Sequence, residues 1–524
     1  MEPVSPEAVT AWAKHLGSDA TAVDPASLRH DLASGNLTDA FDAASAAAGS
    51  HARLRIGDEE VSHEQAHRSA ASTASVLAEL GVRHGSRLVF CASTSVRFVI
   101  AYLAALRLGA TVVLANPSYP PADLHRLATR SRAVLVVADD DLAGALSPDC
   151  AVAPLDDITA RAASAPERAP AAITSDNIAL LAYTSGTTGD PKGVPLSHGM
   201  LLASIRSAMQ SWRWTASDTL VHALPLFHQH GLSGLHATLL AGSRAIMLSK
   251  FDPGELISVV DREQATVVFA VPSIHQRLAE LGADELAPLR RLRLLTSGSA
   301  PLSPALADAL VDKLGFAPLE RYGLTESGLD VSNPYDGERR IGTVGVPLPG
   351  VEVGLFDATG SAVAAGEDGE IVLRGPQVFD GYLDDPDATR AAFWPDGWFR
   401  TGDLGRWSDD GYLTITGRLK ELIISGGMNI APREVELALE QHASVEEAAV
   451  AGMPSERWGE EVAAWVVPHD ATSFDADELI AHCREHLAPY KCPKQVFALD
   501  VLPRNAMGKI ARSDLAPTAS GASE

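Results

Sequence analysis

The chain has 524 residues, which is too long for one ordinary hydrophobic core, so we expect two or more domains. With 46% hydrophobic and 21% charged residues it has the composition of a globular protein. Its net charge of −25 argues against a nucleic-acid partner, because the phosphate backbone would repel it.

Three classes of feature are missing from the sequence. The apolar runs are too short to cross a bilayer, so no membrane span is expected. The first residues lack the basic, apolar and small-residue order of a signal peptide, which favours the cytoplasm. The cysteines are scattered without a C-x-x-C pair, which predicts neither a disulfide framework nor a zinc site.

Apolar, strand-like runs alternate with helix-length segments over the first 300 or so residues. Residues 1 to about 50 are rich in alanine and predict short helices. Strand-like runs then follow at residues 88–92, 111–115, 133–138, 245–248, 266–270 and 292–295, with a helix-length segment at 96–108. This rhythm is typical of βαβ units around a buried, mostly parallel sheet.

Glycine and proline become frequent after about residue 333. Short runs at 351–356 and 369–373 predict an antiparallel β subdomain, and residues 435–487 alternate helix-like and strand-like segments. We therefore predict an α/β fold with a large N-terminal domain of βαβ-type sheets plus an antiparallel β subdomain (residues 1–418). A small, mobile α+β C-terminal domain (residues 419–524) is expected to follow.

A loop rich in glycine and hydroxyl groups spans residues 184–193, directly after an apolar run at 178–182. Its glycines free the backbone, so that successive N–H groups can face an anion. The side chains add hydroxyl donors and one lysine charge; the candidate residues are Thr184, Ser185, Gly186, Thr187, Thr188, Gly189 and Lys192. The lysine falls three residues after the second glycine, so this is not the P-loop pattern. The composition predicts a triphosphate site.

Residues 184–193 resemble the signature loop of the adenylate-forming superfamily, which holds acyl-CoA synthetases, peptide-synthetase adenylation domains and firefly luciferase. The resemblance covers the chain from about residue 37 to residue 512, with several motifs in the family's order. It implies an enzyme that uses ATP and Mg²⁺ to activate a carboxylic acid as an acyl-adenylate. The acyl group then passes to coenzyme A, and AMP and pyrophosphate are released. A homodimer is an open alternative to a monomer.

Two further segments resemble the family's nucleotide motifs. Residues 297–302 resemble its adenine-side loop, in which a glycine permits close approach of a flat base; the residues concerned are Ser297, Gly298, Ser299 and Ala300. Residues 320–326 resemble its second nucleotide motif, which includes Gly323. There Tyr322 would offer its ring to the adenine and Thr325 would donate to a phosphate oxygen. Glu326 would hold Mg²⁺, a hard ion that prefers oxygen ligands.

The ribose and the lid are assigned by the same resemblance. Asp403 would accept hydrogen bonds from the ribose hydroxyls, as an acidic residue does in dinucleotide folds, and Arg418 would be a second ribose or phosphate contact. Lys509 would bridge the acid oxygen and the α-phosphate, where its charge lowers the barrier to adenylation. Lys420 matches the hinge about which the C-terminal domain rotates between the half-reactions. Rotation would bring Gly426 and Gly427 to the site, leaving room for the pantetheine arm of coenzyme A.

The acid pocket is expected around residues 225–231, the helix after residue 272 and Ser297. His228 resembles the family's pocket-gating histidine. Arg277 falls on the helix that forms the pocket wall, where an arginine would pair with a second carboxylate. Malonyl-CoA synthetases resemble this segment, so a malonate-like dicarboxylate is favoured, although residues 420–430 and the pair His275 and Gln276 resemble oxalyl ligases. The other possibility is that Arg277 points into solvent.

Other functions stay open at this point. One is a stand-alone adenylating enzyme that delivers its acyl group to a carrier-protein thiol or an amine, or that activates an anion such as nitrite. Another is an oxalyl or medium-chain acyl-CoA ligase. A non-catalytic nucleotide sensor is disfavoured because Lys192, Glu326 and Lys509 are all present. A serine hydrolase is disfavoured because no G-x-S-x-G elbow occurs.

Overall fold

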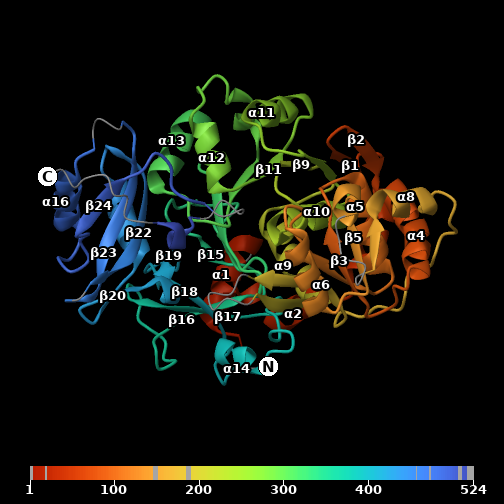
Figure 1. Ribbon diagram of the computed structural model, residues 1–524, viewed down its shortest axis with the longest axis horizontal. Coiled ribbons are helices and arrows are strands. Elements are labelled where there is room, and N and C mark those ends of the chain that lie inside the picture. Colours follow the sequence, from red (N-terminus) through yellow and green to blue (C-terminus); the bar gives the residue numbers. More distant parts are fainter. Residues whose placement is uncertain are drawn as a thin grey trace.

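The computed structural model describes residues 4–17, 20–144, 151–184, 191–455, 457–470, 474–504 and 510–515. The fold is α/β, with two large sheets, an antiparallel sheet and a C-terminal sheet (Figure 1). The six-stranded sheet lies at the right of the view in orange and yellow, and the C-terminal sheet at the left in blue. No helix in the described part of the chain is long and apolar enough to cross a membrane.

The six-stranded sheet has the order β6-β5-β3-β4-β7-β8 and is parallel except for its last pair. Its strands are β3 (Arg87–Cys91), β4 (Thr111–Leu114), β5 (Leu135–Ala138), β6 (Val152–Pro154), β7 (Ile178–Thr184) and β8 (Lys192–Ser197). Residues 88–91 and 135–138 are buried throughout, as expected of parallel strands covered on both faces. The antiparallel pair β7–β8 places Thr184 opposite Lys192, so the glycine-rich loop joins the two strands of a hairpin.

The nine-stranded sheet has the order β15-β14-β13-β12-β11-β9-β10-β1-β2. Its strands are β1 (Arg53–Ile56), β2 (Glu59–Ser62), β9 (Thr219–His222), β10 (Arg244–Met247), β11 (Val267–Ala270), β12 (Leu294–Ser297), β13 (Leu319–Tyr322), β14 (Val331–Ser332) and β15 (Val346–Pro347). The middle strands are parallel, and antiparallel strands close both ends. The predicted strand runs are thus confirmed, but they divide between two sheets, because apolar periodicity does not say which strands pair.

Helices cover the sheets. They are α1 (Pro6–Leu16), α2 (Pro25–Ala33), α3 (Leu37–Ala47), α4 (His63–Glu79), α5 (Val96–Arg107), α6 (Pro121–Ser131), α7 (Asp140–Ala143), α8 (Leu155–Ala162), α9 (His198–Ser211), α10 (Gln229–Ala241), α11 (Pro253–Arg262), α12 (Pro272–Ala279) and α13 (Pro304–Leu314). Helix α5 contacts β4 in one large sheet and β1 and β2 in the other. It lies between the sheets, which explains why it is apolar on almost every side.

The remaining sheets confirm the antiparallel β subdomain and the α+β segment that the sequence predicted after about residue 333. Strands β16 (Glu352–Phe356), β17 (Asp368–Arg374), β18 (Phe399–Trp407) and β19 (Leu413–Arg418) form an antiparallel sheet, with α14 (Pro386–Ala392) beside it. The C-terminal sheet contains β20 (Ile423–Ser425), β21 (Met428–Ile430), β22 (Val445–Ser455), β23 (Gly459–Pro468) and β24 (Gln495–Ala498), covered by α15 (Pro432–Glu440) and α16 (Ala476–His486). Its apolar core, which begins at Ile423, is separate from the main core. A domain boundary at residues 418 and 419 stays a proposal.

Candidate active site

A cleft of about 2590 Å³ lies where the ends of several strands meet the C-terminal segment. Its walls include residues of β12, β13, β18 and β19, of helices α10 and α12, and of the C-terminal helix α15. The described candidate residues that line it are Thr184, Lys192, His228, Ser297, Ser299, Ala300, Tyr322, Gly323, Thr325, Glu326, Asp403, Arg418 and Lys420. Most of the sequence-predicted site is therefore brought into one cavity.

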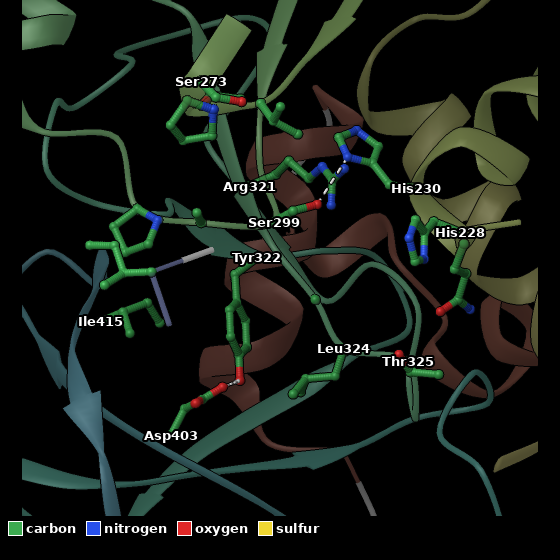
Figure 2. Close-up of a pocket in the computed structure, with 18 of the residues that line it drawn as sticks. His228, His230, Ser273, Ser299, Arg321, Tyr322, Leu324, Thr325, Asp403 and Ile415 are labelled. Atoms are coloured by element: carbon green, nitrogen blue, oxygen red, sulfur yellow. Dashed lines mark hydrogen bonds between the residues drawn. The ribbon is translucent and has the colours of Figure 1, made fainter. Parts of the chain in front are cut away.

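Tyr322, Asp403 and Arg418 form a hydrogen-bonded group on one wall. The Tyr322 hydroxyl donates to Oδ2 of Asp403 at 2.8 Å (Figure 2). Arg418 Nε lies 2.6 Å from Oδ1 of the same carboxylate. Asp403 is buried, and β18 and β19 place it directly opposite Arg418. Burial, and then the Asp403 charge, raise the pKa of Tyr322 well above its usual value, so the phenol stays a donor. This wall can receive a nucleoside between an aromatic ring and a carboxylate.

A second group gathers near the hairpin β7–β8. The Lys192 ammonium lies 4.8 Å from the centre of the Tyr382 ring, and the Tyr382 hydroxyl donates to Oε1 of Glu326 at 3.2 Å. Burial raises the pKa of Glu326, which is the response of a carboxylate that lacks a counter-cation. The predicted loop residues Ser185, Gly186, Thr187, Thr188 and Gly189 lie outside the described residues, but Thr184 and Lys192 on either side of them line the cleft.

Mg²⁺ fits the donor set at this second group. Magnesium is bound by one or two carboxylates together with phosphate oxygens and water, rather than by an all-protein cage. Among the described residues, no group of three or more His, Cys, Asp and Glu side chains could hold a metal ion. The single buried carboxylate of Glu326 suits an ion that arrives with a nucleotide.

Two histidines line the opposite side of the cleft. His228 precedes α10, and its ring lies 4.4 Å from that of Phe227. His230 is in the first turn of α10, where its Nδ1 lies 3.1 Å from the Ser299 hydroxyl, while its buried Nε2 has no partner among the described residues. The buried Ser297 hydroxyl likewise has no partner in the described part of the chain. Polar groups left open in this way are rare in folded proteins and are expected where a ligand binds.

Arg321, which we did not select from the sequence, also lines this side of the cleft. It lies on β13 between two residues of the predicted nucleotide motif, and Figure 2 shows its side chain near His230 and Ser299. Gly298 makes room for it: a Cβ at that position would lie 2.6 Å from Cζ of Arg321. We expected Gly298 to make room for a base, whereas the group that a side chain at position 298 would meet is this guanidinium. The available signal was an arginine within a motif expected to be buried.

Arg277 does not occupy the predicted place. It is on helix α12, as expected, but its side chain is 57% exposed and its Nε lies 3.4 Å from Oε2 of Glu280. It is absent from the residues that line the cleft, whereas Ser273 and Gln276 of the same helix line it. The structure thus has the alternative in which Arg277 points into solvent, because a residue at the edge of a helix face can pair with the residue three positions on. A role of Arg277 in binding the acid stays a prediction.

The C-terminal segment presents Arg504 and Ile510 to the cleft. Lys509 lies outside the described residues, but Arg504 and Ile510, which flank its loop, line the cleft. Gly426 and Gly427 form the turn of the hairpin β20–β21, both with positive φ, and are not among the lining residues. Lys420 lines the cleft in the short 3₁₀ turn after β19. Under the rotation hypothesis this is the orientation that adenylation requires.

Comparison with known proteins identifies the family. Residues 41–383 match the model of the AMP-binding enzyme family, and residues 434–509 match that of the AMP-binding enzyme C-terminal domain. A feruloyl-CoA synthase of Amycolatopsis sp is 37% identical over 88% of this chain and 94% of that protein. The mitochondrial malonate–CoA ligase ACSF3 of Mus musculus is 33% identical over 83% and 82% of the two chains.

A solved structure agrees with these matches in fold. MatB from Rhodopseudomonas palustris with ATP bound is 35% identical, covers 91% of this chain and 98% of its own, and superimposes with a TM-score of 0.86. Both family domains, the relatives and the cleft point to the same chemistry. The chain belongs to the AMP-binding enzyme family and is an AMP-forming acyl-CoA synthetase.

Proposed function

We propose that this synthetase activates a short dicarboxylic acid of the malonate class with ATP and Mg²⁺ and transfers the acyl group to coenzyme A. One observation carries the proposal. The Tyr322–Asp403–Arg418 group and the Lys192–Glu326 group line one cleft, with His228 on its other side. Nucleoside, phosphates and acid can therefore meet in a single cavity.

The first half-reaction joins the acid to AMP. A carboxylate oxygen of the acid forms a bond to the α-phosphorus, and the bond from that phosphorus to the bridging oxygen breaks, releasing pyrophosphate. Asp403 orients the ribose, and Lys192 with Lys509 stabilises the negative charge that develops on the phosphate oxygens. Glu326 would hold Mg²⁺, which when bound would supply further charge neutralisation at the phosphates.

The second half-reaction exchanges AMP for sulfur. The thiolate of coenzyme A attacks the carbonyl carbon of the adenylate, and the bond to the phosphate oxygen breaks, so AMP leaves with the electron pair. The C-terminal domain (residues 419–524) rotates about Lys420 between the two steps. This removes the Lys509 loop and brings the turn at Gly426 and Gly427 to the cleft.

The names of relatives and the polar side chains on one side of the cleft support a short dicarboxylic acid as the substrate. Malonate–CoA ligases and an oxalate–CoA ligase of Arabidopsis thaliana are among the relatives at 33–34% identity. The acid side of the cleft carries His228, His230 and Arg321, which favours an anionic acyl chain over a long apolar one.

An acid panel tests the proposal. Pyrophosphate release and thioester formation would be followed with malonate, oxalate, butyrate, octanoate and ferulate, each with and without coenzyme A. We expect malonate to give the highest kcat/KM and malonyl-CoA as the product. A preference for ferulate or octanoate, or an acyl product that forms only on another acceptor, would contradict it.

A further inference from the structure

Tyr382 lies between two charged side chains of the cleft. Its ring faces the ammonium of Lys192, which lies 4.8 Å from the ring centre, and its hydroxyl donates to Oε1 of Glu326 at 3.2 Å. Burial, and then the charge of Glu326, raises the pKa of Tyr382, so the phenol remains a hydrogen-bond donor at neutral pH. All three residues line the cleft. One neutral side chain therefore contacts both a cation and a carboxylate.

The chain on either side of Tyr382 is hydrogen-bonded to the segments that carry these two partners. The backbone N–H of Phe379 donates to the carbonyl of Glu326 at 2.8 Å. Further along the chain, the N–H of Leu383 donates to the carbonyl of Gly193 in strand β8 at 2.9 Å. These two bonds hold Tyr382 between strand β8 and the nucleotide motif, so its position does not depend on its side-chain contacts alone.

The Tyr382 ring is also fixed by its neighbours. Phe379 is buried, and its ring packs edge-on against that of Tyr382 with the centroids 4.9 Å apart. The backbone N–H of Tyr382 donates to Oγ1 of Thr389 in α14 at 2.9 Å. Gly381 lets the chain pass this close to α14, because a Cβ there would lie 2.5 Å from Cγ2 of Thr389. Packing and hydrogen bonds of this kind are what hold functional side chains in place.

An ion pair between Lys192 and Glu326 would close the site to its ligands. Both residues lie in the described part of the chain, and no ion pair joins them there. Phosphate oxygens need the ammonium and Mg²⁺ needs the carboxylate, so a direct pair would have to break before either could bind. An aromatic ring attracts a cation without neutralising its charge. An ionised carboxylate has about four lone-pair positions, so it can keep the hydroxyl while a metal ion binds.

We propose that Tyr382 is a positioning residue for adenylation: its hydroxyl keeps the carboxylate of Glu326 available to Mg²⁺, and its ring keeps the ammonium of Lys192 available to the phosphates. The inference rests on the proposed function, which assigns ATP and Mg²⁺ to these two groups, and deepens it. The thioester half-reaction should not depend on Tyr382, because neither the triphosphate nor its metal ion takes part in that step.

Two variants separate the hydroxyl from the ring: Tyr382→Phe and Tyr382→Leu. Tyr412→Phe is the matched control, because the buried Tyr412 is a similar tyrosine that does not line the cleft. Its hydroxyl donates to the carbonyl of Glu338 at 3.0 Å, and Cζ of Arg340 lies 4.0 Å from its ring centre. Calorimetry would measure the binding of α,β-methylene-ATP with and without Mg²⁺, in the absence of any acid.

The two Tyr382 variants should differ in their response to Mg²⁺. Tyr382→Phe is expected to bind the analogue about 10-fold more weakly than the wild type with Mg²⁺, and within about twofold of it without, since a hydrogen-bond partner of the metal-binding carboxylate is lost. Tyr382→Leu should weaken metal-free binding too, by about threefold or more, because the ammonium loses its ring. Pyrophosphate release should fall in both variants, while thioester formation from added acyl-adenylate should not change. Tyr412→Phe should match the wild type throughout.

The outcomes separate this role from the proposed function. Equal affinity of Tyr382→Phe and the wild type in the presence of Mg²⁺ would overturn the positioning role, as would equal losses in both half-reactions or the same loss in Tyr412→Phe. If Mg²⁺ tightened binding through Tyr382 but no acid gave pyrophosphate, the positioning role would stand and the proposed function would fail. Malonyl-CoA formed by Tyr382→Phe with the wild-type dependence on Mg²⁺ would leave the proposed function and remove the positioning role.

Discussion

Asp403 holds together the Tyr322–Asp403–Arg418 group, which we propose binds the nucleoside. Its two carboxylate oxygens are engaged by Tyr322 from β13 and by Arg418 from β19, so one buried side chain connects two sheets. An ionised carboxylate has about four lone-pair positions, which leaves room to accept ribose hydroxyls as well. The residue thus orders its neighbours before the ligand arrives.

Replacing this carboxylate should weaken nucleotide binding. We expect Asp403→Asn to lower kcat/KM for ATP by about 10- to 100-fold, since hydrogen bonds to a charged group contribute about 1.5–3 kcal/mol each. Asp368→Asn is the matched control, because Asp368 pairs with Arg406 in the same sheet at an exposed position. Steady-state kinetics with ATP varied checks this, and equal KM values for the two variants would argue against the ribose assignment.

Arg277 and Arg321 show that a sequence motif does not predict which of its side chains lines the cleft. Arg277 and Arg321 are both flanked by residues of recognisable motifs. Arg321 lines the cleft and Arg277 does not. Glu280 is within reach of Arg277, whereas room for Arg321 is left by Gly298, which is distant from it in sequence. Neither condition can be recognised from the motif alone.

At the scale of elements, the N-terminal helices α1 and α2 pack against the antiparallel sheet and hold it in place. Trp12 of α1 is fully buried and donates from Nε1 to the carbonyl of Val351 at 2.7 Å, directly before β16. Arg29 of α2 reaches the buried carboxylate of Glu352 at 2.8 Å, and Arg374 approaches it at 3.0 Å. Both helices precede residues 41–383, the part that matches the family model. They stabilise the sheet that presents Asp403.

Removing the buried indole should therefore destabilise the whole N-terminal part. Trp12→Ala is expected to lower the free energy of unfolding by about 3–5 kcal/mol through lost burial and the cavity left behind. Trp458→Ala, at a tryptophan that is 43% exposed, should cost less than about 1 kcal/mol. Urea denaturation followed by far-UV circular dichroism measures both, and similar values would show that α1 is not a structural anchor.

At the scale of the whole molecule, the proposed rotation makes the position of the C-terminal segment decide which half-reaction can occur. Arg504 and Ile510, which form an isolated β-bridge, line the cleft, while the turn at Gly426 and Gly427 does not. Under this proposal, a cation for adenylation and an opening for pantetheine cannot share the same space, so the two steps need different placements of the segment.

Lys509 should accordingly matter in one half-reaction only. Lys509→Ala is expected to reduce pyrophosphate release by roughly two to four orders of magnitude, while thioester formation from added acyl-adenylate changes little. Lys494→Ala, an exposed lysine of the same segment, serves as the control. Equal losses in both half-reactions would contradict the rotation.

Buried neutral histidines should make the fold sensitive to acid. Burial lowers the pKa of five of them to about 4 and that of a sixth, His236, to about 3; the five are His15, His63, His198, His222 and His275. Because each folded-state pKa lies below the unfolded value of 6.5, the unfolded chain binds more protons between these values. The free energy of unfolding should therefore fall as the pH drops from about 6.5 to about 4.

Buried carboxyls act in the opposite direction, among them Glu320, Glu326 and Asp330. Burial raises the pKa of Glu320 to about 8 and that of Asp330 to about 7, so their contribution falls as the pH rises toward those values. The shifted histidines outnumber these carboxyls. The loss of stability as the pH falls should therefore be larger than the loss as the pH rises. Urea denaturation at about pH 7, 6 and 5 measures the slope, and His63→Leu, which removes one of the six histidines, should make it shallower. A stability that does not change over this range would refute the account.

The sequence by itself determined the chemistry and the local elements. Strand runs such as residues 88–91 and helices such as α5 follow from apolar periodicity, and the glycine-rich loop with its lysine indicates a triphosphate. The family motifs then named Tyr322, Asp403, Arg418, Lys192 and Glu326, which the fold brings into one cleft. These features are encoded over a few neighbouring residues, where short-range geometry is enough.

Only the tertiary structure decided the pairing of strands into two large sheets, the docking of the N-terminal helices and which arginine lines the cleft. Each of these depends on residues far apart in the chain, as with Trp12 and Val351 or Gly298 and Arg321. Burial and charge balance belong to the assembled molecule rather than to any segment. That is the physical reason why the exposed Arg277 and the cleft-lining Arg321 could not be told apart before the chain was folded.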